Sequence, residues 1–200
     1  MSIQSKVFNR GTPPPAFIQE MVAWAKTAPD EIFDRTPTVG NRDVFNKVHG
    51  ELGPYESLTH RKAVMLEVMR VLAGFESSWK HGEGVDVSRR SPTTEENAEA
   101  GAWQTSYDAR RLDPSLAAFL KSHGIDNGHE FQQAMKTNHT LAMEFVARLL
   151  RVSTKHNGPM YKGAERKSTW PNRPKLWNDD ESIYPWLNRG AVQEFVAMLS

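Results

Sequence analysis

The stretch from Ser57 to Glu76 constrains the fold most strongly. Its apolar residues recur at a spacing that fits an α-helix, and they are Val64, Met65, Leu66, Met69, Leu72 and Ala73. Ser57 suits the N-cap position because its hydroxyl can accept a hydrogen bond from a free N–H group of the first turn. We therefore predict one long buried helix that ends beside a carboxyl group, that of Glu76.

Helical patterns also dominate the rest of the chain. The predicted segments are a helix from about Phe17 to Thr27, a brief turn after Pro29-Asp30, and helices over Asp43–Leu52, Pro114–Gly124, Glu130–Met135, Leu141–Val152 and Ala191–Leu199. Asp113 and Pro114 form a good N-cap and N1 pair. Strand signals are weak, and only Gly101–Ser106 could form a short strand. The sequence predicts a mainly α-helical fold with at most a small β element.

The length of 200 residues suits one domain with a real hydrophobic core. We expect residues 1–15, which include a run of three prolines, to form a flexible or extended lead-in. Residues 16–200 would then form the single domain. The Pro- and Trp-rich segment His156–Trp186 is interpreted as an ordered loop wrapped on the core.

Composition narrows the classes of function. The chain has no cysteine, which excludes disulfides and thiolate metal sites, and its formal net charge is only +1. Neither an apolar signal segment nor a membrane-spanning run is present, so we expect a product made in the cytoplasm without a signal peptide. One basic cluster stands out, and it is more simply a solvated loop than a contact with an acidic polymer: Lys162, Arg166, Lys167, Arg173 and Lys175.

Glu76 is the candidate acid catalyst. Phe75 and Trp79 flank it, and desolvation by such neighbours would raise the pKa of a carboxyl group and let it hold a proton near neutral pH. Ser77 leaves room beside the acid, while Gly101 offers backbone without bulk and Gln104 offers a side-chain amide. The simpler interpretation is an ordinary surface glutamate at a helix end.

Three short segments, in this order, resemble motifs of the lysozyme-like superfamily. Glu76-Ser77 is similar to its Glu-Ser motif, Gly101-Ala102-Trp103-Gln104 to its Gly-Leu-Met-Gln motif, and His156-Asn157-Gly158-Pro159 to its Tyr-Asn-Ala-Gly-Pro motif. Soluble lytic transglycosylases and goose-type lysozymes are the nearest members. The resemblance covers about residues 57–159 and implies a lysozyme-like fold that cleaves the β-1,4 bond between N-acetylmuramic acid and N-acetylglucosamine. It makes Glu76 the general acid.

The sequence departs from the family in several places. The loop between the first two motifs is longer than usual, Ala102-Trp103 replaces Leu-Met, and the third motif has lost one residue and carries His156 in place of Tyr. These departures affect the subsites and leave chitin or a related amino-sugar polymer open as the substrate.

A second carboxylate would decide the mechanism. A hydrolase needs one to act on water, whereas transglycosylases of this superfamily use the substrate's own hydroxyl group. The loop opposite the acid carries Asp86, Glu95, Glu96 and Glu99, and we favour Asp86 and Glu99. The expected substrate-binding residues are Ser77, Trp103, Gln104, Tyr107, His156 and Asn157; the two aromatic rings, like Trp170 and Trp177, could stack on sugars or could anchor the core.

No cofactor or metal is expected. His81 lies near Glu83 and Asp86 and could bind a metal, but a surface histidine is the more common case. Phosphate-binding loops, dinucleotide fingerprints and serine-hydrolase elbows are absent from the sequence.

The hypothesis from sequence is therefore a monomeric peptidoglycan muramidase, acting as an antibacterial effector or a lysin. It would reach the periplasm of a target bacterium through a secretion system such as type VI or a phage lysis route. An effector would need an immunity protein that blocks its cleft in the producing cell. Three alternatives remain open: a lytic transglycosylase, a non-catalytic glycan-binding module of the same fold, and a nucleic-acid-binding helical protein that uses the basic cluster.

Overall fold

The computed structural model describes residues 2–34, 43–84, 93–154, 160 and 182–200. Helices make up most of these residues, and one two-stranded antiparallel sheet accompanies them. The helices are α1 (Pro15–Thr27), α2 (Glu31–Asp34), α3 (Val44–Lys47), α4 (His49–Leu52), α5 (Leu58–Ser77), α6 (Pro114–Ser122), α7 (Gly128–Thr137), α8 (His139–Val152) and α10 (Arg189–Leu199). Two 3₁₀ helices, η1 (Tyr107–Leu112) and η3 (Tyr184–Trp186), and the strands β1 (Glu99–Ala100) and β2 (Thr105–Ser106) complete the set.

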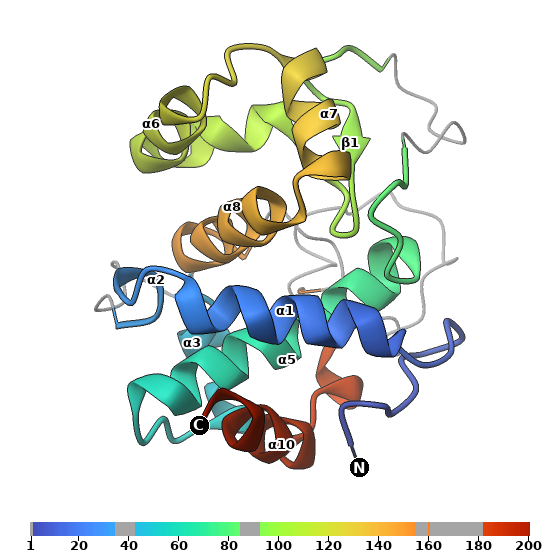
Figure 1. The fold of residues 1–200 in the computed structure, drawn as a ribbon, viewed down its shortest axis with the longest axis vertical. Coiled ribbons are helices and arrows are strands. Elements are labelled where there is room, and N and C mark those ends of the chain that lie inside the picture. The colour runs from blue at the N-terminus through green and yellow to red at the C-terminus, as the bar shows by residue number, and fades with distance from the viewer. Residues whose placement is uncertain (1, 35–42, 85–92, 155–159, 161–181) are drawn as a thin grey trace, which may run out of the picture.

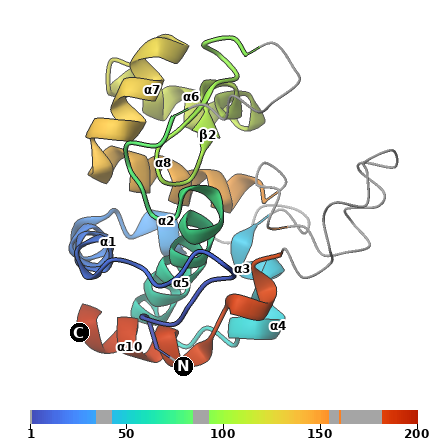
Figure 2. The same cartoon turned by 90° about the vertical axis from the view of Figure 1, so that its right-hand side faces the viewer.

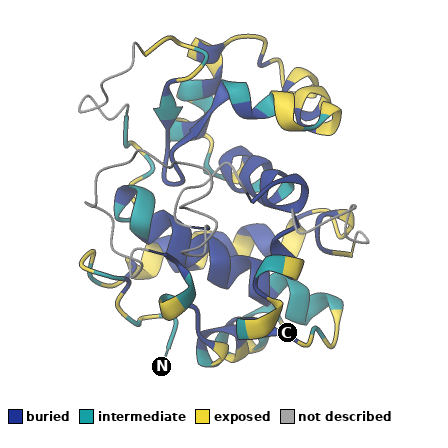
Figure 3. Cartoon of the chain, turned by 180° about the vertical axis from the view of Figure 1, so that it is seen from behind, coloured by how far each residue is buried: buried dark blue, intermediate teal, exposed yellow. Residues whose placement is uncertain are grey.

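Helix α5 is the centre of the core. From Ala63 to Gly74 all of its residues are buried, including the charged pair Glu67 and Arg70. Helices α1, α2 and α10 pack around it. The view coloured by burial shows dark blue, buried helices through the middle of the molecule (Figure 3). Apart from the paired Glu67 and Arg70, this stretch is apolar on all of its faces and has to be covered on all of them, which is why α5 takes the central position.

A second group of elements lies on the other side of α8. The sheet, η1, α6 and α7 lie together above α8, while α1, α5 and α10 lie below it (Figures 1 and 2). The apolar face of α8 is wide enough to contact both groups, since ten of its residues are buried. Helix α8 therefore joins the half of the fold that carries α5 to the half that carries the sheet.

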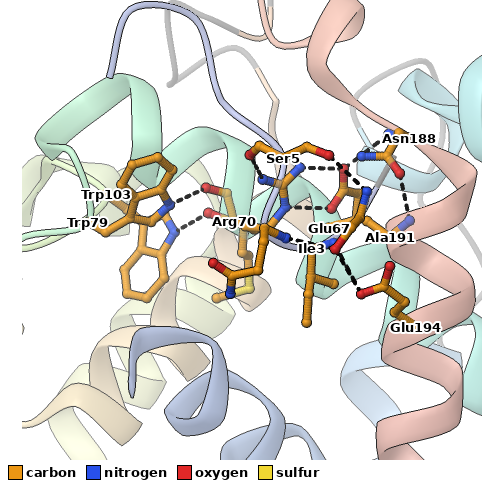
Figure 4. Close-up of polar contacts among 12 residues, drawn as sticks. Ile3, Ser5, Glu67, Arg70, Trp79, Trp103, Asn188, Ala191 and Glu194 are labelled. Carbon is orange, nitrogen blue, oxygen red and sulfur yellow. Dashed lines mark hydrogen bonds and ion pairs between the residues drawn. The ribbon is translucent and has the colours of Figure 1, made fainter. Parts of the chain in front are cut away.

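Buried charges are paired inside this fold. Arg70 donates two hydrogen bonds of 2.8 Å to the Glu67 carboxylate, and the backbone N–H of Asn188, before α10, donates a third at 3.0 Å (Figure 4). Burial nevertheless raises the pKa of Glu67, against the lowering effect of the Arg70 guanidinium. Arg151 of α8 bonds to Asp43, the N-cap of α3, at 2.9 Å.

The N-terminal segment is packed onto the core. It contains no helix or strand before Pro15, as expected, but the Val7 side chain is fully buried and Phe8 stacks on Phe75 at 5.6 Å. The carbonyl oxygen of Ser5 accepts a hydrogen bond from Arg70. The described part of the lead-in, residues 2–14, is therefore tied to α5 instead of extending freely from it.

The expected fold class is confirmed: the chain is mainly helical with a small β element. Ser57 caps α5 by accepting from the His60 N–H, and Asp113 caps α6. Two expectations were incomplete. The single helix expected over Asp43–Leu52 is two short helices, and the single strand expected over Gly101–Ser106 is a hairpin. Most of His156–Trp186 lies outside the described residues. None of the described helices is long and apolar enough to cross a membrane.

Candidate active site

The end of α5 presents Glu76 and Ser77 side by side. Glu76 lies half-buried in the last turn of the helix, and Ser77 is buried. The helix stops at Ser78, which adopts a left-handed conformation with a φ of 56°. This turn ends the helix two residues after Glu76, which is less buried than the Ala63–Gly74 part of α5.

Ser77 connects two segments that the sequence singled out. Its Oγ donates a 2.8 Å hydrogen bond to the carbonyl oxygen of Ala102, in the turn between β1 and β2. The same Oγ accepts a bond from the Lys80 N–H at 3.0 Å. The Glu76-Ser77 and Gly101–Gln104 segments are therefore in direct contact, as the predicted site requires.

Two tryptophans fix this junction to the middle of α5. The indole N–H of Trp79 donates to the carbonyl oxygen of Arg70 at 2.8 Å, and that of Trp103 donates to the neighbouring carbonyl of Met69 at 2.9 Å (Figure 4). Trp103 is only 1% exposed. The expectation that Trp103 stacks on a sugar ring is therefore corrected. The residue anchors the core, because its ring is covered by protein.

The hairpin turn has a demanding backbone. Gly101 has a φ of +77°, and a Cβ at this position would lie 2.7 Å from the carbonyl oxygen of Met135 in α7. Gln104 also has a positive φ, 45°, and its side-chain amide donates to the Gly101 carbonyl at 2.9 Å. The amide of Gln104 thus holds the turn closed. Its predicted contact with a glycan remains a prediction.

Tyr107 does not offer a stacking surface. The residue is 6% exposed, and the guanidinium of Arg110 lies over its ring at 3.6 Å from the centroid. The ring of Phe131 in α7 packs against it at a tilt of 50°, with centroids 5.9 Å apart. The expected sugar contact of Tyr107 is therefore corrected to a role in packing η1 against α7.

The described candidates for the second carboxylate have different environments in the structure. Glu99 lies half-buried in β1, where its backbone pairs with Ser106. The carboxylate of Glu96 is bound by Arg110 at 3.0 Å, and Glu95 is exposed. Glu99 is thus the described acidic residue that lies on the hairpin held by Ser77.

The remaining predicted residues lie outside the described part of the chain. They are Asp86, His156 and Asn157, together with the basic cluster from Lys162 to Lys175 and the aromatic residues Trp170 and Trp177.

A cavity of about 490 Å³ lies elsewhere, between α2, α6 and α8. Arg148 and Arg151 line it, but both guanidiniums are engaged: Arg148 bonds to Glu144 at 2.7 Å and Arg151 to Asp43 at 2.9 Å. None of the predicted site residues that the structure describes lines this cavity. Its size does not make it the better candidate, because its cations are already neutralised by protein carboxylates.

The structure also assembles a cluster that sequence spacing missed. His81 lies beside Glu20 of α1 and His139 of α8. Of the two acidic neighbours that the sequence suggested, Glu83 forms an ion pair with Lys80, and Asp86 lies outside the described residues. Burial, and then the nearby charge of His139, lower the pKa of His81, while Glu20 acts in the opposite direction. No sequence pattern could have shown this cluster, because Glu20 and His139 are 119 residues apart.

Comparison of the chain with protein-family models, with curated proteins and with solved structures gave no match. The functional argument therefore depends on the residues and their geometry.

Proposed function

We propose that this protein is a peptidoglycan glycosidase of the muramidase type, with Glu76 as its general acid. The observation that carries the proposal is the 2.8 Å bond between Ser77 Oγ and the Ala102 carbonyl. It joins the two short segments that resemble lysozyme-like motifs, and Ser77 directly follows the half-buried Glu76. Acid catalysis at a glycosidic bond needs such a group within reach of the leaving oxygen.

The supporting scaffold is rigid where a catalytic carboxyl group needs rigidity. Helix α5 is buried over most of its length, and Trp79 and Trp103 donate to consecutive carbonyls of that helix. Correct positioning of a catalytic group can account for a large part of the reduction in the activation barrier, and small displacements of that group lower the reaction rate. The cross-links from Ser77 and the two indoles are the devices that would hold Glu76 against the hairpin.

In the proposed reaction, Glu76 protonates the glycosidic oxygen of the leaving sugar. Glu99 or Asp86 would activate a water molecule for attack on the anomeric carbon, giving a new reducing end. If neither carboxylate acts, the muramic acid hydroxyl attacks in place of water and the product is a 1,6-anhydro sugar. The two products differ by one water, which mass spectrometry resolves.

The test compares wild-type protein with Glu76→Gln on purified peptidoglycan. Turnover should fall by roughly 10²–10⁴-fold, because general acid catalysis contributes about that much. Glu56→Gln is the matched control, since Glu56 is an exposed glutamate just before α5. Retention of most of the wild-type rate by Glu76→Gln would overturn the proposal, as would the failure of wild-type protein to release fragments from peptidoglycan or chitin.

Such an activity implies a place of action. Peptidoglycan lies outside the cytoplasm, so an antibacterial effector or lysin of this kind would act in the periplasm of a target cell. Expression of the chain behind a periplasmic leader should lyse a Gram-negative host, whereas expression without the leader should not. Equal toxicity from both compartments would contradict a cell-wall substrate.

A further inference from the structure

Three side chains with metal-binding atoms meet on one side of the fold. Glu20 comes from α1, His81 follows the end of α5, and His139 is the first residue of α8. One oxygen of Glu20, Oε2, lies 3.1 Å from Nε2 of His81 and 3.1 Å from Nδ1 of His139. One atom from each residue can be chosen so that all three lie within 4.8 Å of one another.

The environment of His81 is unusual for a histidine without a ligand. Its side chain is 13% exposed, and the rings of Phe17 and His139 pack against it with centroids 5.0 and 3.5 Å away. Among the described residues, neither ring nitrogen has a hydrogen bond of good geometry, although Nε2 approaches Glu20. A buried polar atom without an aligned partner costs free energy, and a bound ion would remove that cost.

We propose that Glu20, His81 and His139 form a binding site for one divalent transition-metal ion, of which Zn²⁺ fits best. Two imidazoles and one carboxylate are a familiar ligand set for this ion, and a water molecule would complete the tetrahedron. Ligand atoms at about 2.0–2.1 Å from a tetrahedral ion lie about 3.3–3.4 Å apart. The 3.1 Å separations around Glu20 Oε2 are close to that value.

Binding requires a small rearrangement. The two imidazole rings are stacked, with only 8° between their planes, and an ion bound to both nitrogens would lie near both planes. One ring therefore has to turn. His139 is the ring that can do so, because its side chain is 36% exposed whereas that of His81 is enclosed.

The charges of the three side chains suit a cation. An imidazole binds a metal ion in its neutral form, so the two histidines would contribute lone pairs and no charge. The carboxylate of Glu20 would balance part of the charge of the ion.

A bound ion would link three parts of the chain that are distant in sequence. The ion would tie α1 to the start of α8 and to the loop that leaves α5, and His81 is five positions beyond Glu76. Metal binding would hold this loop, and it would stabilise the folded state because the three ligands come together only on folding. The proposal does not depend on glycosidase activity.

The test uses the full chain, first treated with a chelator and then dialysed. Isothermal titration with ZnCl₂ should show one site per chain, and the midpoint of thermal unfolding should rise by roughly 5–10 °C at a hundredfold excess over Kd. MgCl₂ should cause no such rise, because Mg²⁺ prefers six oxygen ligands.

Variants decide whether the three residues form the site. His139→Ala and Glu20→Gln should each weaken Zn²⁺ binding at least tenfold, and both substitutions are at partly exposed side chains. His129→Ala is the control, since His129 is an exposed histidine on α7, and it should bind Zn²⁺ like the wild type. Absence of one-site binding by the wild type overturns the proposal, and so does an equal loss in the variants and in the control.

Discussion

Gly101→Ala probes the contact that sets the hairpin against α7. Gly101 has a φ of +77°, and an added Cβ would lie 2.7 Å from the Met135 carbonyl oxygen and 3.3 Å from its carbonyl carbon. Gly124 offers a matched control, because its φ is +70° but a Cβ there would meet nothing within 4 Å. The two substitutions therefore share the cost of a positive φ and differ in the steric clash.

The expected magnitudes follow from these two terms. A left-handed conformation costs an alanine about 1–2 kcal/mol, and the loss of unfolded-state entropy that partly offsets this cost is the same for both variants. Gly101→Ala additionally forces backbone atoms apart, which costs about 1–3 kcal/mol in a packed interior. We expect the free energy of unfolding to fall by about 1–2 kcal/mol in Gly124→Ala and by about 2–5 kcal/mol in Gly101→Ala.

Urea unfolding followed by circular dichroism measures both variants under one set of conditions. In thermal unfolding, each kcal/mol should lower Tm by about 2–4 °C in a chain of this size. Equal destabilisation of the two variants would refute the reasoning, because it would mean that the hairpin does not press against Met135. A fall in activity confined to Gly101→Ala would further connect this contact to the proposed site.

Two more predictions concern Ser77 and His81. Ser77→Ala removes the 2.8 Å bond to the Ala102 carbonyl and should lower the free energy of unfolding by about 1–3 kcal/mol. Ser122→Ala is the control, because it loses a comparable hydroxyl bond at the exposed end of α6. It should cost less than half as much in the same urea titration. The pKa of His81 in the folded protein lies below its ordinary value of 6.5, so as the pH falls the unfolded chain takes up this proton first, and stability should fall below about pH 6.5. The His81→Gln substitution should flatten the dependence of Tm on pH between 7 and 5. An unchanged slope would contradict the assignment.

The sequence by itself determined most of the helices and the capped starts of α5 and α6. Ser57 and Asp113 cap the helices that they were expected to cap, because a side chain that bonds to a nearby N–H acts within four residues and needs no distant partner. The apolar spacing of α5 also sufficed to place it in the core. Glu76 could be proposed as an acid from the sequence for a similar local reason, because the apolar pattern of α5 already indicated that the helix ends beside this residue.

Only the tertiary structure decided which surfaces the side chains face. Trp103 and Tyr107 are aromatic residues near the proposed acid in sequence, and sequence could not tell a sugar platform from a core anchor. The Met69 carbonyl that binds the Trp103 indole and the Phe131 ring that packs on Tyr107 come from other parts of the chain. The cluster of Glu20, His81 and His139 depends on three separate segments meeting. Such contacts are set by how helices pack, and packing joins residues at sequence separations for which no local pattern exists.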